Sequence, residues 1–211
     1  QEKHPCSHKI VNVKNVNKIR DSLGWSGNYV FLASGFVRPD KGYHKIIKSF
    51  YELLKKYPNI KMIISGQPQG DLGTEYAKKL EKMVNNLELN KKISLNFKYI
   101  SNEEYNQNFL ATNAVVVPYV RAIGASGPIH QALSAGKTIL ATAVDHNNGL
   151  INILNLYSSS DENEVYEALE LAIKNNELIS EKSLSYVKTH TWAHMAGEYE
   201  IEYNNLIKNG K

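Results

Sequence analysis

The chain has 211 residues, of which 42% are hydrophobic, 22% are charged and 9% are aromatic, and its formal net charge is +4. This composition excludes a disordered chain, because enough of the sequence is apolar to form a core. The single cysteine, Cys6, excludes a disulfide framework, and no apolar run approaches the roughly 20 residues that a membrane-spanning helix needs.

Segments with strand and helix patterns alternate along most of the chain. Residues 1–28 are irregular apart from a short helix expected at 16–23. Short apolar runs typical of strands buried on both faces follow at 29–34, 60–65, 93–97, 114–117 and 138–141. Apolar residues at helical spacing predict helices at 43–57, 76–87, 102–111, 126–135, 162–174, 179–188 and 192–207.

This alternation predicts an α/β fold, a doubly wound, mostly parallel Rossmann-like sheet with helices on both faces. We divide the chain into a linker or N-terminal extension at 1–28 and one domain at 29–211. Ligands of such sheets bind beyond the carboxyl ends of the strands. The last helix carries a stripe of apolar residues, including Trp192, Tyr199 and Tyr203, which we expect to pack in the core or against another domain.

The positive charge raises the question of a nucleic-acid partner. The lysine pairs at 55–56, 78–79 and 91–92 lie in or just after amphipathic segments, which is typical of solvated helix surfaces. No arginine-rich stripe with interleaved aromatic residues and no zinc-knuckle or helix-turn-helix pattern is present. We therefore expect no nucleic acid and favour an anionic small ligand.

The loop from Gly35 to Gly42 follows the first strand and places two cations, Arg38 and Lys41, at the mouth of the sheet. Glycines at both ends allow sharp turns and close approach of a ligand. Arginine and lysine beside a helix N-terminus suit phosphate oxygens. The spacing alone leaves a solvated loop as an equal alternative.

A second loop runs from Pro118 into the helix expected at 126–135, with Ser126 and Gly127 at the helix start. Backbone N–H groups there can hold a phosphate, and the Ser126 hydroxyl adds a donor. Ser126 could equally be a plain N-cap. Together the two loops indicate a diphosphate held between them.

Several segments resemble known motifs in a fixed order. These are Gly35-x-x-Arg38-x-x-Lys41-Gly42, LLKKYPNIKMIISG at 53–66, VVVPY at 115–119 with Ser126-Gly127 and QALSAG at 131–136, and Thr191-Trp192 with Tyr199 and Tyr203. They are similar to the G-x-x-x-x-x-K-G, P-x-strand-G, V-x-P-S…E-A-M-A-x-G and closing W…Y motifs of the retaining family-4 glycosyltransferases with the GT-B fold. The resemblance covers residues 29 to 208 and indicates one half of such a fold.

The resemblance implies roles for individual residues. Arg38 and Lys41 would contact the diphosphate of a nucleotide-sugar donor and stabilise the departing nucleoside diphosphate. In the same loop, Gly35 and Gly42 would let the donor approach closely. Backbone groups near Tyr99 and Ile100 would meet the base, Ser126 and Gly127 would hold the phosphate or the neighbourhood of the sugar, and Gln131 would bond the ribose.

The family commonly has two glutamates in the V-x-P-S block, separated by seven intervening residues, and this chain departs from that pattern. Ile123 and Gln131 occupy those positions here. A glutamine amide can still bond a ribose hydroxyl. Isoleucine cannot bond a polar sugar, which makes sugar handling the least determined part of this site.

The resemblance implies the donor-binding, C-terminal half of a glycosyltransferase. The whole enzyme would transfer a hexosyl unit with retention from a UDP-, GDP- or ADP-sugar to an acceptor saccharide or lipid-linked glycan. We expect an N-terminal acceptor domain outside these residues, no activity of the chain alone, no cofactor or metal, and a place in the cytoplasm or at the inner face of the membrane. A non-catalytic nucleotide- or sugar-binding module and a GT-B-fold nucleotide-sugar epimerase are the alternatives.

Overall fold

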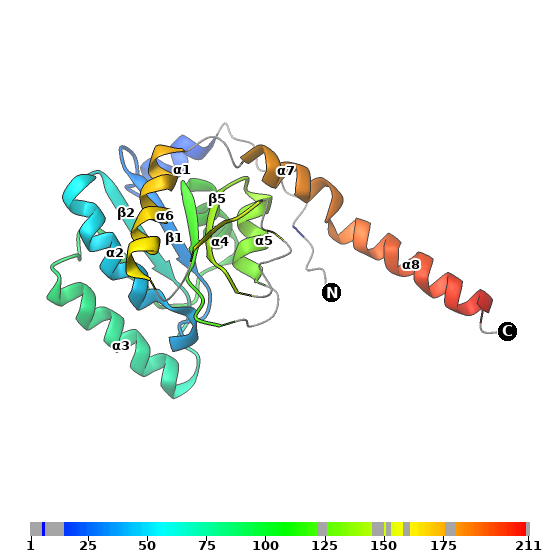
Figure 1. Cartoon of the computed structure of the whole chain (residues 1–211), viewed down its shortest axis with the longest axis horizontal. Coiled ribbons are helices and arrows are strands. Elements are labelled where there is room, and N and C mark those ends of the chain that lie inside the picture. The colour runs from blue at the N-terminus through cyan, green and yellow to red at the C-terminus, as the bar shows by residue number, and fades with distance from the viewer. Residues whose placement is uncertain are drawn as a thin grey trace.

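A six-stranded parallel sheet forms the centre of the molecule, which we describe from a computed structural model (Figure 1). The structure describes residues 6, 15–121, 126–144, 150, 153–157, 161–175 and 180–209. The strands are β1 (Tyr29–Ser34), β2 (Ile60–Ser65), β3 (Ile93–Asn96), β4 (Ala114–Val117), β5 (Thr138–Thr142) and β6 (Asn155–Tyr157). Their order is β3-β2-β1-β4-β5-β6 and every pair is parallel, which confirms the predicted doubly wound sheet.

Helices cover both faces of this sheet (Figure 1). The helices of the described residues are α1 (Val16–Ser22), α2 (Tyr43–Lys56), α3 (Gly70–Asn86), α4 (Asn102–Ala111), α5 (Gly127–Ser134), α6 (Glu162–Lys174), α7 (Ser180–Thr189) and α8 (Trp192–Asn209), with a 3-10 turn, η2 (Pro39–Lys41). One core contains residues of α2, α3 and α6, and the other contains residues of α4, α5 and α7.

Strand β1 shows why the sheet is buried on both sides. Phe31 and Ala33 pack into the first core, whereas Val30 and Leu32 pack into the second, and all four side chains are 0% exposed. Successive side chains of a strand point to opposite faces, so an uninterrupted apolar run serves two cores at once. The same reasoning predicted the other long strands.

Two elements were not predicted. Strand β6 has three residues at the edge of the sheet, too few for an apolar run, and η2 lies inside the first loop. Strand β6 does not alter the carboxyl ends of β1, β2 and β3. The turn η2 has a larger consequence, because it sets the directions in which Arg38 and Lys41 point.

The described part of the predicted linker packs against the domain. The guanidinium of Arg20 donates to Asn113 Oδ1 at 3.0 Å and to the Trp25 carbonyl at 3.2 Å, and Trp25 is buried. Cys6 is also buried, and its N–H donates to the His190 carbonyl at 2.8 Å. A domain boundary at residue 29 stays a prediction.

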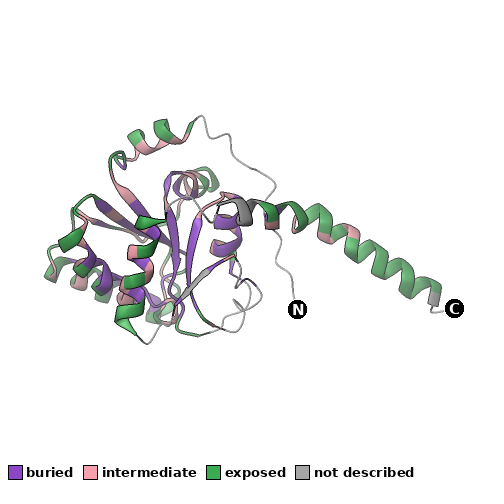
Figure 2. Ribbon diagram, turned by 45° about the horizontal axis from the view of Figure 1, so that its top comes forward, coloured by how far each residue is buried: buried purple, intermediate pink, exposed green. Residues whose placement is uncertain are grey.

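Helix α8 projects away from the sheet and its covering helices (Figures 1 and 2). Trp192, Tyr199, Tyr203 and Leu206 are each more than half exposed, so core packing, one of the two expectations for this stripe, is wrong for these residues. Neither α8 nor another described helix has the length and apolar character needed to cross a membrane.

Candidate active site

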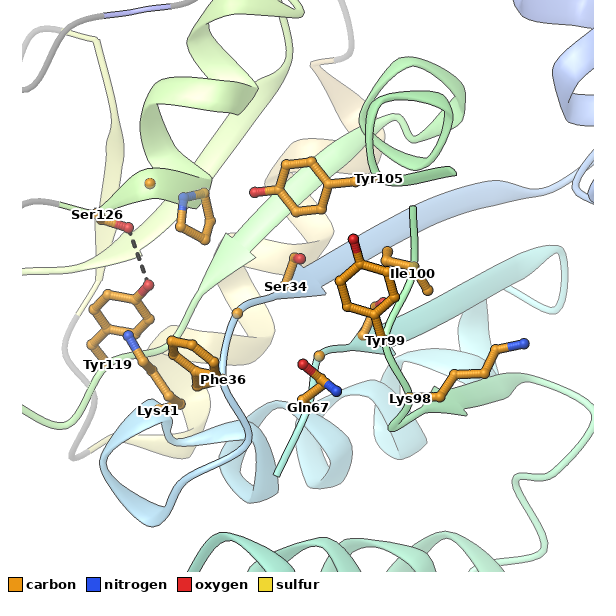
Figure 3. A pocket seen from close by; sticks show the side chains of 15 residues that line it. Ser34, Phe36, Lys41, Gln67, Lys98, Tyr99, Ile100, Tyr105, Tyr119 and Ser126 are labelled. Carbon is orange, nitrogen blue, oxygen red and sulfur yellow. Dashed lines mark hydrogen bonds between the residues drawn. The ribbon is translucent and has the colours of Figure 1, made fainter. Parts of the chain in front are cut away.

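A cavity of about 480 Å³ opens at the carboxyl ends of β1, β2 and β3, beside the start of α5 (Figure 3). From β1 the chain adds β2 and β3 on one side of the sheet and then β4, β5 and β6 on the other, so the strand order reverses at β1. Doubly wound sheets bind their ligands at such a point. The described residues that line it are Ser34, Gly35, Phe36, Lys41, Ser65, Gly66, Gln67, Lys98, Tyr99, Ile100, Tyr105, Tyr119, Ser126, Gly127 and Pro128.

The cavity brings together six of the nine predicted site residues. Those in its lining are Gly35, Lys41, Tyr99, Ile100, Ser126 and Gly127. Arg38, Gly42 and Gln131 are not among the described lining residues. Sequence reasoning did not assign a site role to Ser34, Phe36, Ser65, Gln67, Lys98, Tyr105 or Tyr119. Their signal was positional, because all of them except Tyr105 either end a strand or stand two residues after the end of one.

Arg38 binds protein groups instead of facing the cavity. Its Nε donates to Asp40 Oδ1 at 2.9 Å, and its Nη1 donates to Gln69 Oε1 at 3.0 Å. The hydrogen bond from Arg38 holds the pKa of the Asp40 carboxyl below its usual range. The turn η2 begins directly after Arg38, so the chain changes direction between the two predicted cations.

Lys41 is the predicted cation that reaches the cavity. Its Nζ lies 3.8 Å from the centroid of the Tyr119 ring, a cation–π geometry. Burial lowers the pKa of Lys41 to about 8, with Asp40 acting to raise it and Arg38 to lower it further. The ammonium is therefore charged at neutral pH and only partly hydrated.

Ser126 is the residue before α5, but its side chain does not cap the helix. Its Oγ lies 3.1 Å from the hydroxyl of Tyr119, and the two are joined by a hydrogen bond (Figure 3). Its carbonyl accepts from Nδ1 of the buried His130 at 2.8 Å. The first N–H groups of a helix lack intrahelical partners, so the start of α5 presents positive potential at this wall.

A tight contact between the loop after β1 and the loop after β4 sets the shape of the cavity beside Lys41. Gly42 has φ +69°, and a Cβ on it would lie 1.9 Å from the carbonyl oxygen of Pro118. The N–H of Val120 donates to the carbonyl of Asp40 at 2.9 Å. Gly42 thus lets the loop after β1 lie against the loop after β4 and acts on the site through that contact.

The other end of the cavity follows β2 and β3. Tyr99 is 72% exposed, and the side chain of Lys98 points away from Lys41 and Tyr119 (Figure 3). The Ser65 hydroxyl is buried and has no hydrogen-bond partner among the described residues. A polar atom in that condition beside a cavity is suited to pair with a ligand.

Gln131 lies on α5, where its Nε2 donates to Asn106 Oδ1 at 2.7 Å. Ile123, the other departure from the family pattern, lies outside the described residues. Within the described parts of the chain, no group of His, Cys, Asp and Glu side chains is arranged to hold a metal ion.

The fold and this cavity define an α/β domain with a ligand-sized cavity at the carboxyl ends of its parallel strands. Residues 15–187 match the family model described as "Glycosyl transferases group 1", and the chain belongs to that family. A search of curated proteins found no match.

Solved structures share the fold at low sequence identity. HepE from Anabaena, in complex with UDP, is 17% identical with a TM-score of 0.81 over 92% of this chain and 53% of that one. Sucrose-phosphate synthase from Thermosynechococcus elongatus is 19% identical with a TM-score of 0.75 over 97% and 52%. The C-terminal domain of the group 1 glycosyl transferase LpcC from Francisella tularensis is 20% identical with a TM-score of 0.75 over 85% and 94%. The chain thus spans about half the length of the first two proteins.

Proposed function

We propose that this domain binds the nucleoside-diphosphate sugar of a retaining glycosyltransferase that transfers a hexosyl unit to a saccharide or lipid-linked glycan. The observation that carries the proposal is the cavity itself. It joins the Lys41 ammonium, the start of α5 and the loop after β3 at the carboxyl edge of the sheet. This combination suits a ligand with an anionic centre and a planar base.

Lys41 would contact the diphosphate and stabilise the negative charge that develops on the departing nucleoside diphosphate. The N–H groups at Gly127 and beyond would hold the same oxygens. Gly35 has no side chain to obstruct the phosphate. Arg38 could join only by exchanging Asp40 and Gln69 for phosphate oxygens, since both now accept from it.

The loop at Tyr99 and Ile100 would bind the base, and Gln131 would reach the ribose after leaving Asn106. Three structures of HepE hold UDP, UDP with glucose, and UDP-glucose. These complexes make UDP the first nucleotide to test, before GDP and ADP. We propose that Lys41 and the start of α5 supply the positive charge without a metal or cofactor.

We propose that the whole enzyme also has an acceptor-binding half, because the chain spans about half of HepE. The exposed apolar side chains of α8 would pack against that half. We propose that the enzyme lies in the cytoplasm or at the inner face of the membrane, where it would transfer sugar from a nucleotide-sugar donor to its acceptor.

Calorimetric titration of the chain with UDP, GDP and ADP tests the proposal. We expect binding of at least one nucleotide and a loss of roughly 10- to 100-fold in Lys41→Ala, the range for a hydrogen bond to a charged group. Lys82→Ala, at an exposed position on α3, is the matched control. Failure of all three nucleotides to bind at millimolar concentration would contradict the proposal.

Arg38→Ala gives the second comparison. A loss similar to that of Lys41→Ala would mean that Arg38 leaves Asp40 when the donor binds. Donor hydrolysis or sugar transfer by the full-length protein would exclude a non-catalytic module. Inversion of a sugar centre with the nucleotide still attached would favour an epimerase instead.

A further inference from the structure

We propose that Tyr119 is a positioning residue for the leaving diphosphate: its ring holds Lys41 and its hydroxyl holds Ser126, so that both groups meet one ligand. This inference rests on the proposed function. It assigns to Tyr119 a role that the resemblance did not suggest, because the similar motif has serine at this position.

The ring of Tyr119 fixes the cation. Lys41 Nζ lies 3.8 Å from the ring centroid, where the negative face of the aromatic system attracts an ammonium ion. Tyr119 itself is 2% exposed and packs with the core under α5, so its ring has little freedom to move. A lysine side chain has many rotamers, and this contact selects one that points into the cavity.

The hydroxyl of Tyr119 fixes the second donor. It lies 3.1 Å from Ser126 Oγ, which is itself 3% exposed. Burial raises the pKa of Tyr119, so the hydroxyl stays neutral and can donate. When it donates to Ser126, the serine O–H is directed toward another acceptor, and a phosphate oxygen at the start of α5 would be one.

The backbone of Tyr119 is held from two sides. Thr142 Oγ1 donates to its carbonyl at 2.7 Å, and the next residue, Val120, donates to Asp40 at 2.9 Å. Asp40 is adjacent to Lys41 in η2. Tyr119 therefore links the loop after β1 to the start of α5. These two segments form the walls of the end of the cavity that would bind the diphosphate, and the link keeps their separation fixed.

The experiment compares UDP affinity and its pH dependence in Tyr119→Phe, Tyr119→Leu and wild-type chains. Phenylalanine keeps the ring and loses the hydroxyl, so we expect affinity to fall about fivefold, with the pH dependence unchanged. Leucine also loses the ring, so we expect about a further fivefold loss. In Tyr119→Leu the surroundings of Lys41 stay apolar but the attraction of the ring is lost, so the pKa of Lys41 falls and the pH at which affinity declines moves downward.

Tyr29→Phe is the matched control. The Tyr29 hydroxyl donates to the Ala172 carbonyl at 2.7 Å. Tyr29 is the first residue of β1, so it lies at the amino ends of the strands, opposite the cavity. This variant loses a tyrosine hydrogen bond and should bind UDP as the wild type does. Thermal unfolding of each variant would identify affinity changes caused by unfolding.

The outcomes separate the two proposals. If Lys41→Ala weakens UDP binding but both Tyr119 variants bind like the wild type, the role of Tyr119 is wrong and the proposed function stands. An unchanged pH profile in a folded Tyr119→Leu variant would also overturn the holding of Lys41 by the ring. Failure of the wild-type chain to bind UDP, GDP or ADP would overturn both proposals together.

Discussion

At one end of the cavity, Tyr119 is bound to both Lys41 and Ser126, whereas at the other end Tyr99 is largely exposed and the Ser65 hydroxyl has no partner among the described residues. The first of these, which we propose binds the diphosphate and call the phosphate end, is therefore organised without a ligand. The second, which we propose binds the base and call the base end, leaves an aromatic surface and a polar atom for a ligand to cover. We infer that the fold positions the Lys41 ammonium in advance, whereas the side chains at the base end take their final positions when a ligand binds.

The largest expected effect concerns the contact that organises the phosphate end. Gly42→Ala puts a Cβ 1.9 Å from the Pro118 oxygen in a left-handed backbone. We expect the free energy of unfolding to fall by roughly 2–5 kcal/mol, the sum of about 1–2 for the conformation and about 1–3 for the clash. Denaturant unfolding measures this loss.

Gly24→Ala is the matched control for that measurement. Gly24 has a similar φ of +65°, but no atom lies within 4 Å of its added Cβ. It should therefore lose only the conformational part, about 1–2 kcal/mol. Equal losses in the two variants would mean that the loops do not touch as described.

The contrast between the two ends also explains how far sequence reasoning reached. Strands β1 to β5 and the two loops were predicted because apolar runs, glycines and helix starts are local signals. The difference between Arg38 and Lys41 was not, because the turn η2 and the distant Gln69 and Tyr119 decide which cation faces the cavity. Ser65 was missed for a related reason, since an unpartnered hydroxyl is recognised only when its neighbours in space are known.

Tyr99 tests the base end. Tyr99→Ala removes an exposed aromatic surface, and we expect UDP affinity to fall by about 1–3 kcal/mol, the range for base stacking. Tyr99→Phe should keep the affinity. Pyrophosphate, which has no base, should bind the wild type and Tyr99→Ala equally and Lys41→Ala more weakly. A loss of pyrophosphate affinity in Tyr99→Ala would show that the two ends are not separate.

The pH dependence tests the phosphate end. Lys41 has a pKa of about 8 in the free domain, and a bound diphosphate favours the ammonium and raises that pKa. Affinity should then be nearly constant up to about pH 7 and decline as the pH rises through 8, by roughly eightfold between pH 7.5 and 9. The terminal phosphate, with a pKa near 6, is already ionised in this range. Calorimetry on Lys41→Ala over the same range should show a flat profile.

The smallest expected effect compares two serines that lie in register at the ends of β1 and β2, Ser34 and Ser65. Burial raises the pKa of Tyr105 and the nearby Ser34 hydroxyl lowers it, whereas the buried Ser65 hydroxyl has no partner in the described residues. Ser65→Ala removes an unpaired polar group and should raise the free energy of unfolding by about 1 kcal/mol, while Ser34→Ala should lower it by about 1 kcal/mol.

The same pair shows whether the ligand uses the unpaired hydroxyl. If the base or ribose bonds Ser65, then Ser65→Ala should weaken UDP binding about threefold while stabilising the free domain, since the bond forms only in the complex. Pyrophosphate should bind this variant and the wild type alike. A variant that is more stable and binds UDP as tightly as the wild type would mean that the hydroxyl faces the core, and the base end would then rely on Tyr99 and its loop.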